Sequence, residues 1–221
     1  MDYHFDFSVV IKNWGFLLSG IGATLYVTAF SLLIGALLGL FVGLGRMSSR
    51  QWLSACAAAY VEVFRNTPAL VQLIWVYYCL PILTGWNPSA INSVILALGL
   101  NASAYIAEIV RAGIQSIDRG QMEAGRSIGM SFAQTMRTVI LPQAVRRMLP
   151  SFVNEAVAVL KFSSLVSVLG VADLTYQANV LSTTTFRPIE IFSSIAVVYF
   201  VLCTALATFA RQLERRLARA D

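Results

Sequence analysis

Three stretches of the chain contain no Lys, Arg, Asp or Glu, and they set the pattern of apolar and polar positions. They run over Asn13–Gly45, Asn66–Ala107 and Ile191–Ala210. A helix needs about 20 apolar residues to cross roughly 30 Å of hydrocarbon. The first and third stretches are therefore each long enough for one membrane span, and the middle stretch is long enough to contribute to two.

The polar segments between these stretches predict five spans in one domain, residues 1–221, without an internal repeat. Glycines Gly35, Gly39 and Gly43 fall four residues apart in the first span, a spacing suited to close helix contact. Pro81 and Thr84–Ser89 are expected to form the turn after the second span. The spans are predicted within about Trp14–Leu44, Leu53–Leu80, Ala90–Gly113, Leu149–Gly170 and Ile191–Arg211.

Composition agrees with a membrane protein. Of 221 residues, 57% are hydrophobic and only 12% are charged, about half the charged fraction of a soluble domain. Cys56, Cys79 and Cys203 stand singly in apolar surroundings without CxxC or metal-ligand spacing, so we expect buried thiols and no metal site. The first apolar run is too long for a signal-peptide core and follows an acidic start, so no cleavage is expected.

The basic residues predict the orientation. Segments on one side of the predicted spans hold twelve arginines, and those on the other side hold only Lys12 and Arg187. An excess of Lys and Arg marks cytoplasmic loops, so the N-terminus is expected outside and the C-terminus in the cytosol. Because the charges follow topology, the net charge of +5 does not indicate nucleic-acid binding. The twelve are Arg46, Arg50, Arg111, Arg119, Arg126, Arg137, Arg146, Arg147, Arg211, Arg215, Arg216 and Arg219.

The polar stretch at about 115–147 is too charged to cross the membrane and is expected to form two short cytosolic helices. Asp118 can cap the first helix, and Gly129 suits its end because a residue without Cβ accepts a left-handed conformation. Pro142 is expected to mark the turn into the next span. An ordinary amphipathic helix lying on lipid headgroups is the alternative interpretation of this stretch.

The spacing within this stretch resembles the "EAA" loop of bacterial binding-protein-dependent ABC importers. Glu123-Ala124-Gly125, Gly129 and Val139–Pro142 fall in its register, with Gly125 in place of the second Ala and Val139 in place of Ile. In that family the loop contains the coupling helix, which docks in a groove of the cytosolic ATPase. The resemblance implies that the ATPase-coupling residues are Asp118, Gly120, Glu123, Ala124, Gly125, Gly129, Leu141 and Pro142.

Two further segments resemble the polar amino acid uptake permeases (histidine, glutamine or glutamate type). Tyr60–Tyr77 is similar to their "FRGTPxLVQ" motif with Asn66 for Gly, and Tyr105–Ile117 is similar to "AEIxRxGI". The resemblance covers about Thr24–Arg216. It implies an all-α, type I ABC importer permease in the bacterial inner membrane. It also implies a second permease subunit (identical or a paralogue), an ATPase dimer and an external amino-acid-binding protein as partners.

Several ionisable residues lie within the predicted spans, where such groups usually face a partner or a water-filled cavity. Glu62 and Arg65 are three residues apart, as are Glu108 and Arg111, so each pair can meet on one helix face.

Lys161 lies about 18 Å into the fourth span at 1.5 Å per residue, without an acid three or four residues away. Related permeases usually place an acid where this chain has Phe162, so the resemblance favours an acidic or amide amino acid. A lysine that only binds carbonyls at a helix crossing is the alternative. The predicted substrate-binding residues are Lys161, Ser163, Ser164, Glu108 and Glu155.

These observations predict a permease subunit of an ATP-driven amino-acid importer. No GxxxxGK[ST] phosphate loop is present, so the chain is not expected to be an enzyme, and ATP and magnesium are expected on the partner ATPase. A secondary transporter is one alternative, against which stand the five spans and the docking loop. A membrane scaffold that only recruits an ATPase is the other.

Overall fold

The computed structural model describes the backbone of residues 3–218 and the side chains of residues 3–212, a part of the chain that is helical and contains no strand. Of the predicted cytosolic arginines, Arg219 lies outside these residues. The helices are α1 (Ser8–Lys12), α2 (Trp14–Ser19), α3 (Ile21–Arg46), α4 (Gln51–Asn66), α5 (Ala69–Ile74), the π-helical η1 (Trp75–Cys79), α6 (Leu80–Thr84), α7 (Ala90–Gln115), α8 (Arg119–Ser127), α9 (Phe132–Thr135), the π-helical η2 (Met136–Ile140), α10 (Leu141–Phe162), the 3-10 helix η3 (Ser163–Leu169), α11 (Leu174–Thr185) and α12 (Pro188–Ala218).

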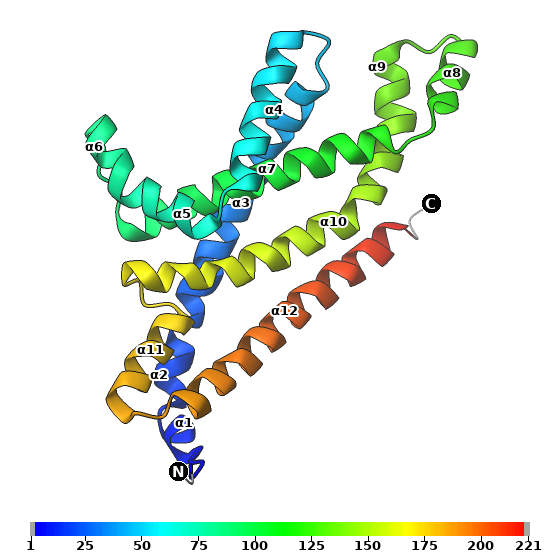
Figure 1. Cartoon of the computed structure of the whole chain (residues 1–221). Coiled ribbons are helices and arrows are strands. Elements are labelled where there is room, and N and C mark those ends of the chain that lie inside the picture. Colours follow the sequence, from blue (N-terminus) through cyan, green and yellow to red (C-terminus); the bar gives the residue numbers. More distant parts are fainter. Residues whose placement is uncertain (1–2, 219–221) are drawn as a thin grey trace.

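Five membrane spans are compatible with the helices in the described residues. Four stretches are each long and apolar enough to cross alone: Trp14–Arg46, Ala90–Gln115, Phe132–Leu169 and Pro188–Gln212. A fifth span is formed if Gln51–Asn66 and Ala69–Thr84 count as one bent pair. Figure 1 shows α8 and α9 at one end of the molecule, and the N-terminus with α1 and α11 at the other.

Among the described residues, α3 and α7 form the most extensive contact between two helices. Gly35, Gly39 and Gly43 of α3 permit this contact. At Gly39, an added Cβ would lie 2.7 Å from the Ile106 side chain and 2.8 Å from the Ser103 carbonyl oxygen. A Cβ added at Gly35 or Gly43 would likewise lie less than 3 Å from an atom of α7. The predicted close-contact face of the first span is therefore confirmed, and its partner is the third span.

We predict that Gly39→Val destabilises the protein by about 1–3 kcal/mol, because the new side chain would overpack against backbone and Ile106. Gly22→Val, at a position of the same helix with open space around it, is the control. Thermal unfolding in detergent measures the difference, at roughly 2–4 °C for each kcal/mol. Equal melting temperatures for the two variants would show that the α3–α7 contact is not tight.

The second span, predicted over about Leu53–Leu80, is a pair of helices bent by 105° between α4 and α5. Pro68 disfavours the helical conformation of the residue before it, and Thr67 is extended with φ −111° and ψ 140°. Side chains satisfy the carbonyls at the break: Thr67 Oγ1 donates to Val63 O at 2.8 Å, and Gln72 Nε2 donates to Phe64 O at 2.8 Å. Pro81, predicted in the following turn, lies instead within α6.

The fourth span begins earlier than predicted. Helical residues run from Phe132 through α9, η2 and α10 to the end of η3 at Leu169. The second of the two expected short helices is therefore not separate, and Pro142 does not form a turn, because it occupies the first turn of α10, where a missing N–H is tolerated. The predicted end at Gly170 is confirmed by its left-handed φ of 74°.

Hydrogen bonds hold the N-terminal segment against the start of α12. The buried Glu190 carboxylate accepts from the Tyr3 hydroxyl at 2.5 Å and from the Asp6 N–H at 2.9 Å. Arg187 donates to the His4 carbonyl at 2.6 Å. Residues before the first span and before the last span therefore form one polar cluster at the end of the molecule opposite α8.

The orientation of these two ends in the membrane remains a prediction, and thiol labelling can test it. Single cysteines would replace Phe5, Thr184 or Ser127, all exposed, after Cys56, Cys79 and Cys203 are changed to Ala. In intact cells, an impermeant maleimide should label positions 5 and 184, whereas position 127 should react only after lysis. External labelling at position 127 would reverse the predicted orientation.

Candidate functional site

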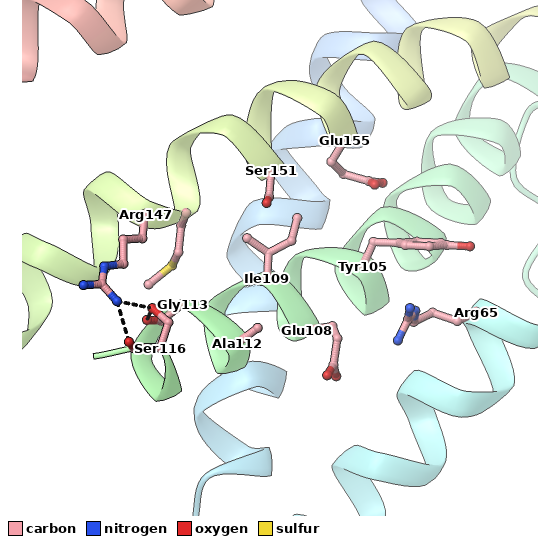
Figure 2. A pocket seen from close by; sticks show the side chains of 11 residues that line it. Arg65, Tyr105, Glu108, Ile109, Ala112, Gly113, Ser116, Arg147, Ser151 and Glu155 are labelled. Carbon is pink, nitrogen blue, oxygen red and sulfur yellow. Dashed lines mark hydrogen bonds between the residues drawn. The ribbon is translucent and has the colours of Figure 1, made fainter. Parts of the chain in front are cut away.

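A cavity of about 400 Å³ lies between α4, α7 and α10; we call it the charged cavity. Arg65 reaches it from the end of α4, Tyr105 and Glu108 from α7, and Arg147 and Glu155 from α10 (Figure 2). The helices that form its walls thus include the bent second span and the long fourth span. The remaining lining residues are Ile109, Ala112, Gly113, Ser116, Met148 and Ser151.

Arg65 and Glu155 approach the cavity from opposite helices, with Tyr105 between them (Figure 2). The Arg65 guanidinium lies 5.3 Å from the centre of the Tyr105 ring, within the range of a cation–π contact. Glu155 is half-buried on α10. Among the described residues, neither a hydrogen bond nor an ion pair joins this carboxylate to another group, so both charges are available to a ligand.

Glu108 is held differently, because its carboxylate is shared between two arginines. It pairs with Arg46 at the end of α3 and with Arg111 on its own helix, whose Nε donates at 2.9 Å. The predicted Glu108–Arg111 pair is confirmed, and Arg46 is a partner that spacing along one helix cannot reveal. This predicted substrate-binding residue is thus already neutralised.

The expected Glu62–Arg65 pair is wrong. Glu62 accepts instead from Asn66 Nδ2 at 2.7 Å, and Arg65 turns towards Tyr105. Arg65 thus meets an aromatic face from α7 instead of the carboxylate on its own helix. The aromatic partner belongs to the "AEIxRxGI" segment but carries no charge, so a search for counter-charges misses it.

Lys161, Ser163 and Ser164 lie at the end of α10 and the start of η3, away from the charged cavity. The Ser163 hydroxyl donates to Leu160 O at 2.7 Å, and the Ser164 hydroxyl donates to Lys161 O at 2.8 Å. Lys161 is exposed and lies within electrostatic range of Cys203 on α12. The structure does not gather these three residues with Glu108 and Glu155, and their part in substrate binding stays a prediction.

Phe162 does share a face with Glu155, because seven residues correspond to almost two full turns. It lines a neighbouring cavity of about 470 Å³ together with Arg65, Tyr105 and Asn101. The position where related permeases place an acid therefore faces the same region as Arg65, and here it presents an aromatic ring.

A polar bridge that the sequence does not predict fixes the bend of the second span on α7. Asn101 Nδ2 donates to Gln72 Oε1 at 3.1 Å and to Phe64 O at 3.1 Å. One turn away, the Tyr60 hydroxyl lies 2.6 Å from that of Ser103. These buried contacts hold the end of α4, and with it Arg65, at a fixed place beside the cavity. Gln72 belongs to the "LVQ" part of the resemblance, which is the one signal that could have indicated it.

The local structure of the predicted coupling loop, at about residues 115–147, follows its sequence. Asp118 Oδ1 accepts from Gly120 N at 2.7 Å at the start of α8. Gly129 has a left-handed φ of 84°, and Met130 N donates back to Gly125 O at 3.0 Å. The predicted cap and helix end are thus confirmed.

The substitution of Gly for Ala at position 125 has a structural reason. Gly125 is buried against α9, and an added Cβ would lie 2.6 Å from Thr135 Cγ2 and Oγ1. The other side of α8 is open: Glu123 and Ala124 are exposed, as are the apolar Ile128 and Phe132 beside them. The exposed surface of α8 therefore combines the acidic Glu123 with the basic Arg119 and Arg126 and with apolar side chains.

Comparisons with known proteins agree on one class. Residues 35–219 match the family described as "Binding-protein-dependent transport system inner membrane component". The arginine transport system permease protein ArtQ of Bacillus subtilis is 35% identical over 216 residues, which cover 98% of this chain and 99% of ArtQ. The glutamine transport system permease protein GlnP of Escherichia coli is 37% identical over 216 residues, 96% of this chain and 98% of GlnP.

A solved structure of an amino acid ABC transporter, described as "with histidines", superposes with a TM-score of 0.90 and 43% sequence identity. The match covers 97% of this chain and all of that chain. The named substrates of the relatives include both a cationic and an amide amino acid. The likeness therefore establishes the fold and the transporter class and leaves the amino acid open.

Proposed function

This chain belongs to the family of binding-protein-dependent transport system inner membrane components and is a permease component of an amino-acid ABC importer, and from that premise we propose that its charged cavity binds a polar amino acid, with acidic and amide side chains favoured. The chain is not an enzyme, because ATP hydrolysis in such importers belongs to a separate subunit.

The observation that carries this proposal is the opposed pair of Arg65 and Glu155. An α-amino acid presents a carboxylate and an ammonium group on one carbon. Arg65 offers a planar donor that matches a carboxylate, and Glu155 offers an acceptor for the ammonium. Both lie on the same cavity without a direct bond between them, so a zwitterion can bridge the gap that separates them.

The remaining charges support the preference for acidic or amide side chains. Once Glu155 has met the α-ammonium group, the other carboxylate of the cavity, Glu108, is already paired with Arg46 and Arg111. Arg147 adds a positive charge at the α8 end of the cavity, and Phe162 adds none beside Glu155. A cationic side chain would therefore enter this region without a free counter-charge, a costly arrangement within a membrane.

We further propose that α8 docks on an ABC ATPase dimer. The complex would also contain a second permease subunit and an external amino-acid-binding protein, in the bacterial inner membrane. The exposed apolar side chains of Ile128 and Phe132, together with the exposed charges of Arg119, Glu123 and Arg126, support the docking surface, because interfaces combine an apolar core with a polar rim. A secondary transporter would need neither the ATPase nor this surface, and a scaffold would not need the charged cavity.

Co-purification and transport test this proposal. The chain, its ATPase and its binding protein would be placed in proteoliposomes with radiolabelled glutamate, glutamine, arginine and histidine. We expect ATP-dependent uptake that requires the binding protein and is highest for glutamate or glutamine. Uptake without an ATPase would support a secondary transporter, and ATPase recruitment without uptake of any amino acid would support a scaffold.

We predict that Glu123→Lys abolishes ATP-dependent uptake, because a reversed charge at the docking surface costs several kcal/mol where the wild-type charge is complementary. Glu123→Gln, which removes the charge without reversing it, should lose uptake only in part. Uptake assays in membrane vesicles, with immunoblots for the permease and the ATPase, measure both variants. Normal uptake with Glu123→Lys would remove Glu123 from the docking surface.

A further inference from the structure

One π-helical turn, η2, lies within the fourth span and joins α9, which packs against α8, to α10. The Leu141 N–H donates to the carbonyl of Met136, five residues earlier. Pro142 follows and has no N–H, so it cannot continue the backbone ladder. Such single π turns occur frequently at functional sites. The helix is therefore weakened at the place where movement of the loop would have to enter α10.

Two contacts from one face of α8 lie on either side of this turn. Gly125 packs directly against Thr135, the last residue before η2. Gln121 Oε1 accepts from Gln143 Nε2 at 3.2 Å, and Gln143 lies just after η2. Gln121 and Gly125 are four residues apart, so they share a helix face. Thus α8 lies across η2 and contacts the helix both before and after it.

The Gln143 amide also holds η2 itself. Its Nε2 donates to the Val139 carbonyl, within the π turn, at 2.9 Å. One turn further along α10, Arg147 donates to the Ser116 carbonyl at the end of α7. Gln143 is therefore the one described side chain that joins α8, η2 and α10 by hydrogen bonds.

We propose that α8 stabilises η2 by contacting the helix on both sides of it. In this proposal, Gln143 is the positioning residue that transmits displacement of α8 to α10. Without the contacts of α8 on both sides of η2, a displacement of α8 would only bend the helix at the π turn. With these contacts, the displacement enters α10, the helix that carries Glu155 about 18 Å beyond Gln143. This inference rests on the proposed docking of α8 with the ATPase, and it concerns a residue outside the motif that the resemblance assigns to coupling.

Three variants separate this role from simple stability. Gln143→Leu removes the hydrogen bonds to Gln121 and to Val139 O at similar side-chain volume. Gln121→Leu removes only the hydrogen bond between Gln121 on α8 and Gln143 on α10. Thr138→Val is the matched control: Thr138 lies in η2 and is exposed, and its hydroxyl donates to Gln134 O at 2.7 Å within the same continuous helix rather than to α8.

The measurement is the number of amino acids imported per ATP hydrolysed by the complete complex in proteoliposomes. We expect Gln143→Leu to lower this ratio about threefold, the order expected when the one neutral hydrogen bond between α8 and α10 is lost, while ATPase stoichiometry and basal hydrolysis stay normal. The double variant with Gln121→Leu should be no worse than Gln143→Leu, because both act on one link. Thr138→Val should match wild type.

A wild-type ratio of import to ATP hydrolysis in Gln143→Leu would overturn the proposed role of Gln143. Independent losses that multiply in the double variant would also overturn it. A wild-type chain that binds no ATPase would instead overturn the proposed function. If Gln143→Leu fails to fold, the double variant Gln121→Cys with Gln143→Cys provides a second test of the proposal. Its native cysteines are replaced by Ala. A short thiol-to-thiol cross-linker should restore the import ratio that the two cysteines lower, and a further loss on cross-linking would contradict the proposal.

Discussion

Gly129→Val is expected to reduce ATP-dependent uptake at least about tenfold while leaving the spans in the membrane. Gly129 ends α8 with a φ of 84°, a conformation that is strained for a β-branched residue. Strain of this kind costs on the order of 1–3 kcal/mol, and relief of it would turn α8 away from Thr135 and out of its docking position. The packed contacts of α3 and α7 lie elsewhere and should persist.

Gly129→Asn is the matched control, because asparagine accepts the left-handed conformation far more easily. We expect it to retain most of the uptake. Uptake in vesicles, together with the amount of ATPase that co-purifies with each variant, measures the effect. If valine and asparagine behave alike, the left-handed conformation of Gly129 is not needed for coupling.

Elements that depend on local chemistry could be predicted from the sequence. The cap at Asp118 and the end of α8 at Gly129 require only residues within one turn of each other. The glycine row of α3 likewise predicted a close contact. In each case the signal is a short-range property: a side chain that reaches a nearby N–H, or a missing Cβ.

Two features of the fold that the sequence did not predict both concern proline. Pro68 bends the second span by 105°, because Thr67 before it is extended and side chains from both sides satisfy the freed carbonyls. Pro142 does not interrupt the fourth span, because it lies in the first turn of α10, where the preceding π turn has already shifted the ladder. Hydropathy alone cannot distinguish these cases, since the surrounding residues are equally apolar.

The charged cavity depends on contacts between distant segments, which spacing does not reveal. Arg46 and Glu108 are 62 residues apart, and the placement of Arg65 over Tyr105 depends on the bridge from Asn101 to Gln72. Spacing within one helix therefore predicts Arg111 as a partner of Glu108 and does not reveal Arg46. The predicted site at Lys161 likewise rested on hydroxyls that are bonded to their own helix.

The largest expected effect on substrate recognition comes from Glu155→Gln. If Glu155 meets the α-ammonium group, loss of its charge removes a charge-assisted hydrogen bond of about 1.5–3 kcal/mol, or roughly one to two decades in affinity. All amino acids should be affected alike, because all carry this group. Binding of radiolabelled amino acids to the purified complex, without the external binding protein, separates the membrane site from the selectivity of that protein.

Two further variants address the side chain of the substrate. Phe162→Asp restores a carboxylate on the face of α10 that carries Glu155, so it should raise binding of arginine and histidine relative to glutamate. Lys161→Met tests the alternative placement near α12: if Lys161 attracts an acidic side chain, glutamate binding should fall while glutamine binding changes less. Glutamate binding at the wild-type level in Lys161→Met would make Lys161 structural, and unchanged binding of every amino acid in Glu155→Gln would place the substrate outside the charged cavity.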